Sequence, residues 1–273
     1  MKNGGSNPPA PGNRCAGPPG GLSCRPGGFV FYYARMLLPL AATGVALGAW
    51  AYGTYEPNSP LFGRAIGRGS PAQRVAYLTF DDGPNPGATD RILEVLEERS
   101  VPAAFFVLGR HVRLHPQTAS RLARSPHVIG NHTQRHPKLH LRGRRFIEGE
   151  LRAAHASITD VLERTPRCFR APHGLRNPAV HSVARELGYD VFGWTLGVWD
   201  SSCPGAEEIR ARVRRGLRPG AIILLHDGDG YASEGDRAQT AEALDGIIRD
   251  ARDVGYEFRP LTELMTAVPE AGS

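Results

Sequence analysis

Short apolar runs alternate with amphipathic segments over residues 73–268 of this 273-residue chain. Residues 146–163 show the helical pattern most clearly, because their apolar side chains recur at intervals of three and four. Repeated strand–helix alternation predicts parallel strands covered by helices, as an open sheet or a barrel. The predicted strands are Val75–Phe80, Ala103–Leu108, Val128–Gly130, Cys168–Arg170, Val191–Leu196, Ala221–His226 and Glu257–Arg259. The other predicted helices are Ala179–Leu187, 206–217 and 238–252.

The residues before this domain differ in composition from the rest. Residues 1–35 are rich in Gly and Pro and hold four bases and no acid, which predicts a disordered basic tail. Residues 36–55 carry no charge and as a helix would extend about 30 Å, enough to cross a bilayer. Because the positive charges precede this run, we expect everything after it to be exported, with 36–55 as a membrane anchor or a cleaved signal peptide. Residues 56–72 are predicted as a linker.

Composition excludes several classes of protein. A hydrophobic fraction of 41% argues against wholesale disorder, and 22% charged residues argue against a multi-span membrane protein. Four of the six net positive charges belong to residues 1–35, so we expect no nucleic-acid partner. With only four cysteines the chain is no disulfide scaffold. Cys168 and Cys203 lie in the exported part, where a disulfide is permitted, although two free thiols are the favoured alternative.

Two adjacent acids, Asp81 and Asp82, directly follow the first predicted strand and precede a Gly-Pro pair. Neighbouring side chains at a strand end point in different directions. One carboxylate can therefore bind a metal while the other receives a proton. Taken alone, this motif favours the alternative, a solvated turn, because Asp-Gly-Pro is common in turns.

Three pairs of histidines have the spacing that suits a divalent metal. His132 and His136 follow a predicted strand, as the two acids do. His136/His140 and His111/His115 have the same spacing. We interpret His111 and His115 as surface histidines at the start of an exposed helix.

The remaining strand ends carry chemistry as well. The carboxyl ends of parallel strands meet at one edge of a sheet, so their side chains are expected to converge there. A lone histidine after a strand is weak evidence, but five marked strand ends together predict an active site. Besides the acids and His132/His136, the marked positions are Arg170, Pro172, His173, Gly174, Asp200, His226 and Asp227.

In their order these blocks resemble the motifs of the polysaccharide deacetylase family, the NodB-homology carbohydrate esterases of family 4. The resemblance covers about residues 76–264. Its matching blocks are Thr79-Phe80-Asp81-Asp82-Gly83-Pro84, His132-Thr133-x-x-His136, Arg170-x-Pro172-x-Gly174 and Leu224-Leu225-His226-Asp227.

The resemblance implies a distorted (β/α) barrel of about seven parallel strands and metal-assisted removal of acetyl groups from N-acetylated sugars. It implies Asp82, His132 and His136 as ligands of a divalent metal, with zinc expected. Asp81 would be the general base, oriented by Arg170, and His226 the general acid, paired with Asp200. The substrate-binding positions would be Pro172, His173, Gly174, Trp194 and Leu224, the last beside the acetyl methyl group.

Two departures from the family pattern bear on the substrate. His173 stands where the third motif usually has an aromatic residue. In the fourth motif Trp194 and Asp200 match, but Gly197 and Ser201 replace an acid and a tryptophan.

Amide hydrolysis requires chemistry of this kind, because an amide is a poor electrophile with a poor leaving group. A metal activates water and polarises the carbonyl, a base accepts a proton, and an acid protonates the departing amine. We expect a monomeric deacetylase acting on an N-acetylglucosamine-containing glycan, anchored in the membrane if residues 36–55 are not cleaved. An esterase acting on O-acetylated polysaccharide and a catalytically weak glycan-binding module are the alternatives.

Overall fold

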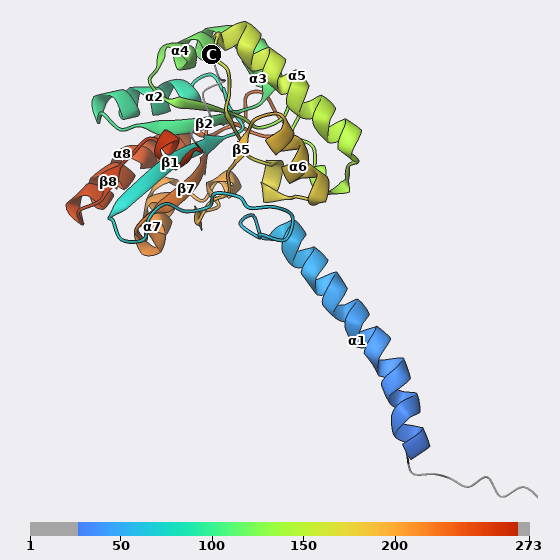
Figure 1. Ribbon diagram of the computed structural model, residues 1–273. Helices are drawn as coiled ribbons and strands as arrows, with labels where there is room; N and C mark the ends of the chain where they lie inside the picture. Colours follow the sequence, from blue (N-terminus) through green and yellow to red (C-terminus); the bar gives the residue numbers. More distant parts are fainter. Residues whose placement is uncertain (1–26, 267–273) are drawn as a thin grey trace, which may run out of the picture. The chain divides into compact units, whose positions relative to one another are not determined.

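Parallel strands form the centre of this computed structural model, which describes the backbone of residues 27–266 and the side chains of 39–266 (Figure 1). Seven strands follow the order β5-β4-β3-β2-β1-β7-β6, and β8 pairs in addition with β1. The pairings between these strands are parallel. This confirms the predicted α/β class with about seven parallel strands. The strands are β1 (Val75–Asp81), β2 (Ala103–Val107), β3 (Val128–Asn131), β4 (Cys168–Phe169), β5 (Asp190–Val191), β6 (Leu196–Gly197), β7 (Ala221–His226) and β8 (Glu257–Phe258).

Helices surround this sheet as an outer layer (Figure 1). Helix α7 packs on α8, α8 on α2, α2 on α4, α4 on α5, and α5 on α6. The helices of the domain are α2 (Ala88–Glu98), α3 (Gly109–Leu114), α4 (Pro116–Arg124), α5 (Arg144–Leu162), α6 (Pro178–Glu186), α7 (Ala206–Gly216) and α8 (Ala238–Asp253). Short 3-10 helices are η1 (Leu139–Leu141), η2 (Pro172–Gly174), η3 (Asp200–Ser202) and η4 (Leu261–Leu264).

The bounds of these elements follow from local chemistry. All seven residues of β1 are buried, as expected for a central strand with a layer on each face. Helix α6 begins at Pro178, and the Asn177 side chain caps it by accepting hydrogen bonds from the backbone N–H groups of Ala179 and Val180. Helix α5 ends where Glu163 takes a left-handed conformation.

The strand predicted over Val191–Leu196 is wrong as a single element, because the structure divides this segment between β5 and β6. The Phe192 N–H still donates to the carbonyl of Phe169 in β4, whereas the Thr195 N–H donates to the carbonyl of Ile222 in β7. The chain therefore crosses from one edge strand of the sheet to the other. The result is an incomplete barrel, with no ladder between β5 and β6 in the described part of the chain.

The helix α1 (Gly27–Tyr55) precedes the domain, and the chain divides into compact units after Leu47. Residues 1–26 of the predicted tail lie outside the described residues, and α1 includes its last nine positions. Residues 36–55 are helical, but none of the helices in the described ranges is long and apolar enough to cross a membrane. The anchor is not confirmed.

Residues 56–72, predicted as a linker, lack regular secondary structure but pack firmly on the domain. Ile66 pairs with Phe192 at the end of β5. The guanidinium of Arg176, which is 1% exposed, donates to the backbone carbonyls of Gly63 at 3.0 Å and Ser59 at 2.8 Å. One buried cation therefore holds this segment in place.

Replacing Arg176 with Met should release this segment. Each buried acceptor left unpaired costs about 1–3 kcal/mol, so we expect the free energy of unfolding to fall by at least about 2 kcal/mol. Trypsin should cut faster at Arg64 and Arg68. Urea denaturation and timed digestion measure both effects, with the exposed Arg145→Met as the control. Equal digestion of the two variants would contradict the packing role.

Candidate active site and metal centre

The two acids at the end of β1 point in different directions, as predicted. Asp81 is the last residue of the strand, and its Oδ1 lies 2.7 Å from Arg170 Nη1. Asp82 has a φ of 76°, in a left-handed region that side chains rarely adopt and that aspartate tolerates better than most. This turn directs its carboxylate away from Arg170 and toward two histidines. Strain of this type costs about 1–3 kcal/mol and is typical of functional sites.

Asp82, His132 and His136 form a buried cluster whose ligand atoms all lie within 4.8 Å of one another. Asp82 Oδ1 is 3.4 Å from His132 Nε2 and 3.1 Å from His136 Nε2. His132 directly follows β3, and His136 has a φ of 62°. The structure thus brings together the three residues predicted as ligands.

The donor set of this cluster suits a divalent cation. Asp82 Oδ1 is buried without a hydrogen-bond partner, which is costly unless a cation binds it. His132 Nδ1 lies 2.8 Å from the Arg170 carbonyl, so Nδ1 carries the proton and Nε2 keeps its lone pair for a metal. One carboxylate and two imidazoles are ligands that zinc accepts, with a fourth position left for water.

The electrostatics of the cluster also favour positive charge. Burial opposes ionisation of Asp82, but the nearby imidazoles of His132 and His136 outweigh it and hold the pKa below its ordinary value. Burial lowers the pKa of His136 to about 3, so this imidazole is neutral and able to ligate. For His132, the carboxylates of Asp81 and Asp82 outweigh burial and raise the pKa.

Arg170 is fully buried at the end of β4 and is bound on several sides. Nη1 donates to Asp81 Oδ1 and, at 2.8 Å, to Thr79 Oγ1, while Nη2 donates to the Gly193 carbonyl at 2.9 Å. The guanidinium carbon lies 4.2 Å from the centre of the Phe106 ring. These contacts fix the orientation of the Asp81 carboxylate.

His226 is the last residue of β7, the strand that pairs with β1. Its Nδ1 lies 2.8 Å from Asp200 Oδ1, and its backbone N–H donates to Asp200 Oδ2 at 2.7 Å. Asp200 is fully buried and also accepts from the Thr240 hydroxyl at 3.0 Å. Burial disfavours the His226 imidazolium, but the Asp200 carboxylate outweighs it and raises the pKa to about 9. This imidazole therefore holds its proton at neutral pH.

One cavity of about 260 Å³ is lined by the metal cluster, Asp81 and His226, whereas Arg170 and Asp200 are buried and do not line it. Of the predicted substrate positions, His173, Gly174, Trp194 and Leu224 line it, whereas Pro172 is buried and does not. The segment after β7, residues 228–237, contributes four lining residues that were not predicted: Asp229, Gly230, Tyr231 and Arg237. We call this segment the post-β7 loop.

The prediction that His111 is a surface residue is wrong, because it is fully buried. Its Nδ1 lies 2.8 Å from the Asp82 backbone carbonyl, and its Nε2 accepts from Arg110 Nε at 3.2 Å. His111 thus supports the turn that orients a predicted metal ligand. His115 is partly buried, with Nε2 3.0 Å from the Ser233 carbonyl.

Asp227, the neighbour of His226, supports the same turn. Its Oδ2 accepts from the Thr89 hydroxyl at 2.6 Å, and Thr89 Oγ1 accepts from the Asn85 N–H at 2.8 Å. Burial raises the pKa of Asp227 to about 7. A Cβ at Gly83 would overlap this carboxylate, so the Asp-Gly-Pro turn requires glycine there.

Cys168 and Cys203 are not bonded to each other. Cys168 is buried on β4, and Cys203 is exposed after η3. The disulfide is therefore not formed, and the alternative of two free thiols holds.

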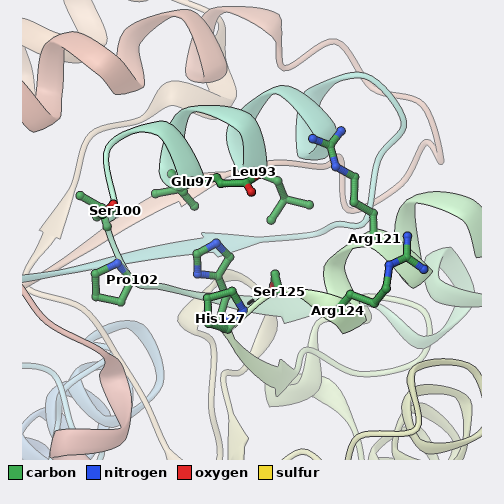
Figure 2. A pocket seen from close by; sticks show the side chains of 11 residues that line it. Leu93, Glu97, Ser100, Pro102, Arg121, Arg124, Ser125 and His127 are labelled. Atoms are coloured by element: carbon green, nitrogen blue, oxygen red, sulfur yellow. Dashed lines mark hydrogen bonds between the residues drawn. The ribbon is translucent and has the colours of Figure 1, made fainter.

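A larger cavity of about 680 Å³ lies between α2 and α4 and contains none of these groups (Figure 2). It lies beside the residues that precede β2 and β3, which is the opposite end of those strands from the cluster. Arg121 on its wall is already paired with Asp90 and Glu94. Its size alone therefore does not make it the active site.

Comparison with known proteins agrees with this geometry. A family model described as polysaccharide deacetylase matches residues 68–192. A chitooligosaccharide deacetylase of Sinorhizobium fredii is 38% identical over 73% of this chain and 96% of its own length. A peptidoglycan-N-acetylglucosamine deacetylase of Bacillus cereus is 32% identical over 71% of this chain and 89% of its own. The solved structure of peptidoglycan deacetylase PdaC from Bacillus subtilis superposes with a TM-score of 0.62 at 31% identity, covering 72% of this chain and 92% of that one.

The His226–Asp200 pair makes a prediction about titration. In chelator-treated protein, we expect the His226 ring to titrate near pH 9 by NMR. Asp200→Asn should lower this midpoint, because the Asp200 carboxylate is the strongest influence that raises the pKa of His226. The raised pKa of His226 stabilises the folded protein below about pH 6.5. This contribution to stability is lost as the pH rises through 9. Asp200→Asn should therefore cost more stability at pH 6 than at pH 10. A wild-type midpoint below 7 would contradict the pairing.

Proposed function

This chain belongs to the polysaccharide deacetylase family, and from that premise we propose that it is a metal-dependent hydrolase that removes N-acetyl groups from an N-acetylglucosamine-containing glycan. One observation carries the proposal. The Asp82/His132/His136 cluster lines a single cavity together with two further groups, Asp81 and His226.

We propose that Asp82, His132 and His136 hold the metal and that this metal is zinc. When bound there, the cation would lower the pKa of water and polarise the acetyl carbonyl. The orphaned Asp82 oxygen and the fixed tautomer of His132 support this assignment.

The side chains around the cluster divide the proton transfers between them. Asp81, held by Arg170, is the group placed to accept a proton from the attacking water. His226 has Nδ1 toward Asp200, so Nε2 is the atom that delivers a proton to the departing amine. The raised pKa of His226 keeps this proton available until the C–N bond breaks. Leu224 supplies an apolar wall for the acetyl methyl group.

The names of the relatives favour amides over esters. Both curated relatives named above are deacetylases of N-acetylated glycans. An esterase acting on O-acetylated polysaccharide would use the same residues and is the second candidate. A catalytically weak glycan-binding module is disfavoured, because each side-chain role has its candidate in the cavity.

We also propose that the domain acts outside the cytoplasm as a monomer. The 20 uncharged residues 36–55, preceded by Arg35, support export.

Elemental analysis tests the metal site. We expect one divalent metal per wild-type chain and its loss from His132→Ala and His136→Ala, because each removes a ligand. His155→Ala, on α5 and outside the cluster, should keep the metal. Full retention of metal in the His132→Ala/His136→Ala double variant would refute the assignment.

Acetate release tests the reaction. Wild-type protein should release more acetate from chitopentaose than from acetyl-xylan. Asp81→Asn should lose at least ~100-fold in kcat while keeping its metal, because it removes the base and leaves the three ligands. Preference for acetyl-xylan would establish the esterase instead. An active Asp81→Asn enzyme would show that Asp81 is not the base.

A further inference from the structure

Tyr231 is an exposed aromatic side chain at the mouth of the active-site cavity. Its side chain is 66% exposed, although it lines the cavity with the metal cluster. Resting on the proposed function, we propose that Tyr231 forms a binding subsite for the pyranose ring next to the reacting sugar. The enzyme would thus recognise an oligomeric glycan rather than a single acetylated sugar.

Hydrogen bonds between side chains and its backbone groups hold the post-β7 loop, which carries Tyr231, in place. Arg110 Nη2 donates to the carbonyls of Gly230 and Tyr231, both at 2.8 Å. Asp229 Oδ1 accepts from the N–H groups of Tyr231 and Ala232 at 2.8 and 3.0 Å. Arg237 in turn lies 3.2 Å from Asp229 Oδ2. A platform ordered before binding loses little entropy when the ligand arrives.

The same loop lies directly against the metal cluster. A Cβ at Gly230 would overlap the His136 ring, so only glycine allows this approach. The Tyr231 ring stands edge-on to His136 with centroids 5.6 Å apart. Its hydroxyl lies 3.1 Å from His173 Nε2, and the His173 ring is 4.5 Å from that of His136. The aromatic residue missing from the third motif is thus compensated by a tyrosine from another loop.

The size of the cavity places further sugars outside it. A volume of about 260 Å³ is below the roughly 300–1,000 Å³ of pockets that enclose drug-sized ligands. It holds one acetylated residue at most, so the neighbouring residues of a glycan must lie on the surrounding surface. Pyranose rings have apolar C–H faces, and an aromatic ring with its hydroxyl already engaged offers such a face a partner.

Steady-state kinetics and calorimetry on the full chain test this subsite. For chitopentaose, Tyr231→Ala should raise KM about tenfold, which is about 1.4 kcal/mol, with the loss in KM rather than in kcat, because the variant removes the ring and the apolar area that it covers. Tyr231→Phe should keep KM within about twofold, since it retains the ring. The exposed Tyr52→Ala, outside the cavity lining, is the control.

Binding measured without turnover separates this proposal from the proposed function. In metal-loaded protein carrying Asp81→Asn, adding Tyr231→Ala should raise the Kd for chitopentaose about tenfold by calorimetry. If the wild type released no acetate, the proposed deacetylase activity would be refuted. The change in Kd would still show whether Tyr231 forms a binding subsite. An unchanged Kd would overturn the subsite. Loss of metal from Tyr231→Ala would also overturn it, because Tyr231 would then support His136 rather than the glycan.

Discussion

Arg170 contacts two of the residues assigned to catalysis, the predicted base Asp81 and the predicted metal ligand His132. Its guanidinium binds Asp81, while its backbone carbonyl accepts from Nδ1 of His132. The orientation of the predicted base and the tautomer of a predicted metal ligand therefore both depend on one position at the end of β4. Breaking a buried ion pair of this kind costs about 3–5 kcal/mol, because the remaining charge is left without a partner. Arg170 is thus a positioning residue for both groups.

A second set of contacts supports the turn that carries Asp82. His111 and Asp227 each support the turn after β1, one through the Asp82 carbonyl and the other through Thr89. The left-handed conformation at Asp82 is kept in place by these contacts. The side chains that face the cavity are therefore fixed by neighbours that never touch substrate.

The sequence predicts the parts of this site that depend on strand ends. Parallel strands bring their carboxyl ends to one edge, so Asp81, His132, Arg170 and His226 could be assigned to one place before the structure was known. His111 could not, because its partner is a backbone carbonyl 29 residues away that no side-chain pattern reveals. Tyr231 lies in a loop without a motif, held by Arg110 from a distant helix. The sequence does not predict that Val191–Leu196 divides into two strands, because the hydrogen-bond partners of this segment change within an apolar run.

The register of the central strands has a consequence for how the enzyme is made. Asp81 on β1 is level with His226 on β7, although most of the domain separates them in sequence. During synthesis from the amino end, one edge of β1 stays unpaired until β7 has left the ribosome. Non-local parallel pairing of this kind is slow to form. The proposed base and the proposed acid therefore meet only in the nearly complete chain, and a nascent or truncated fragment without β7 lacks one of them.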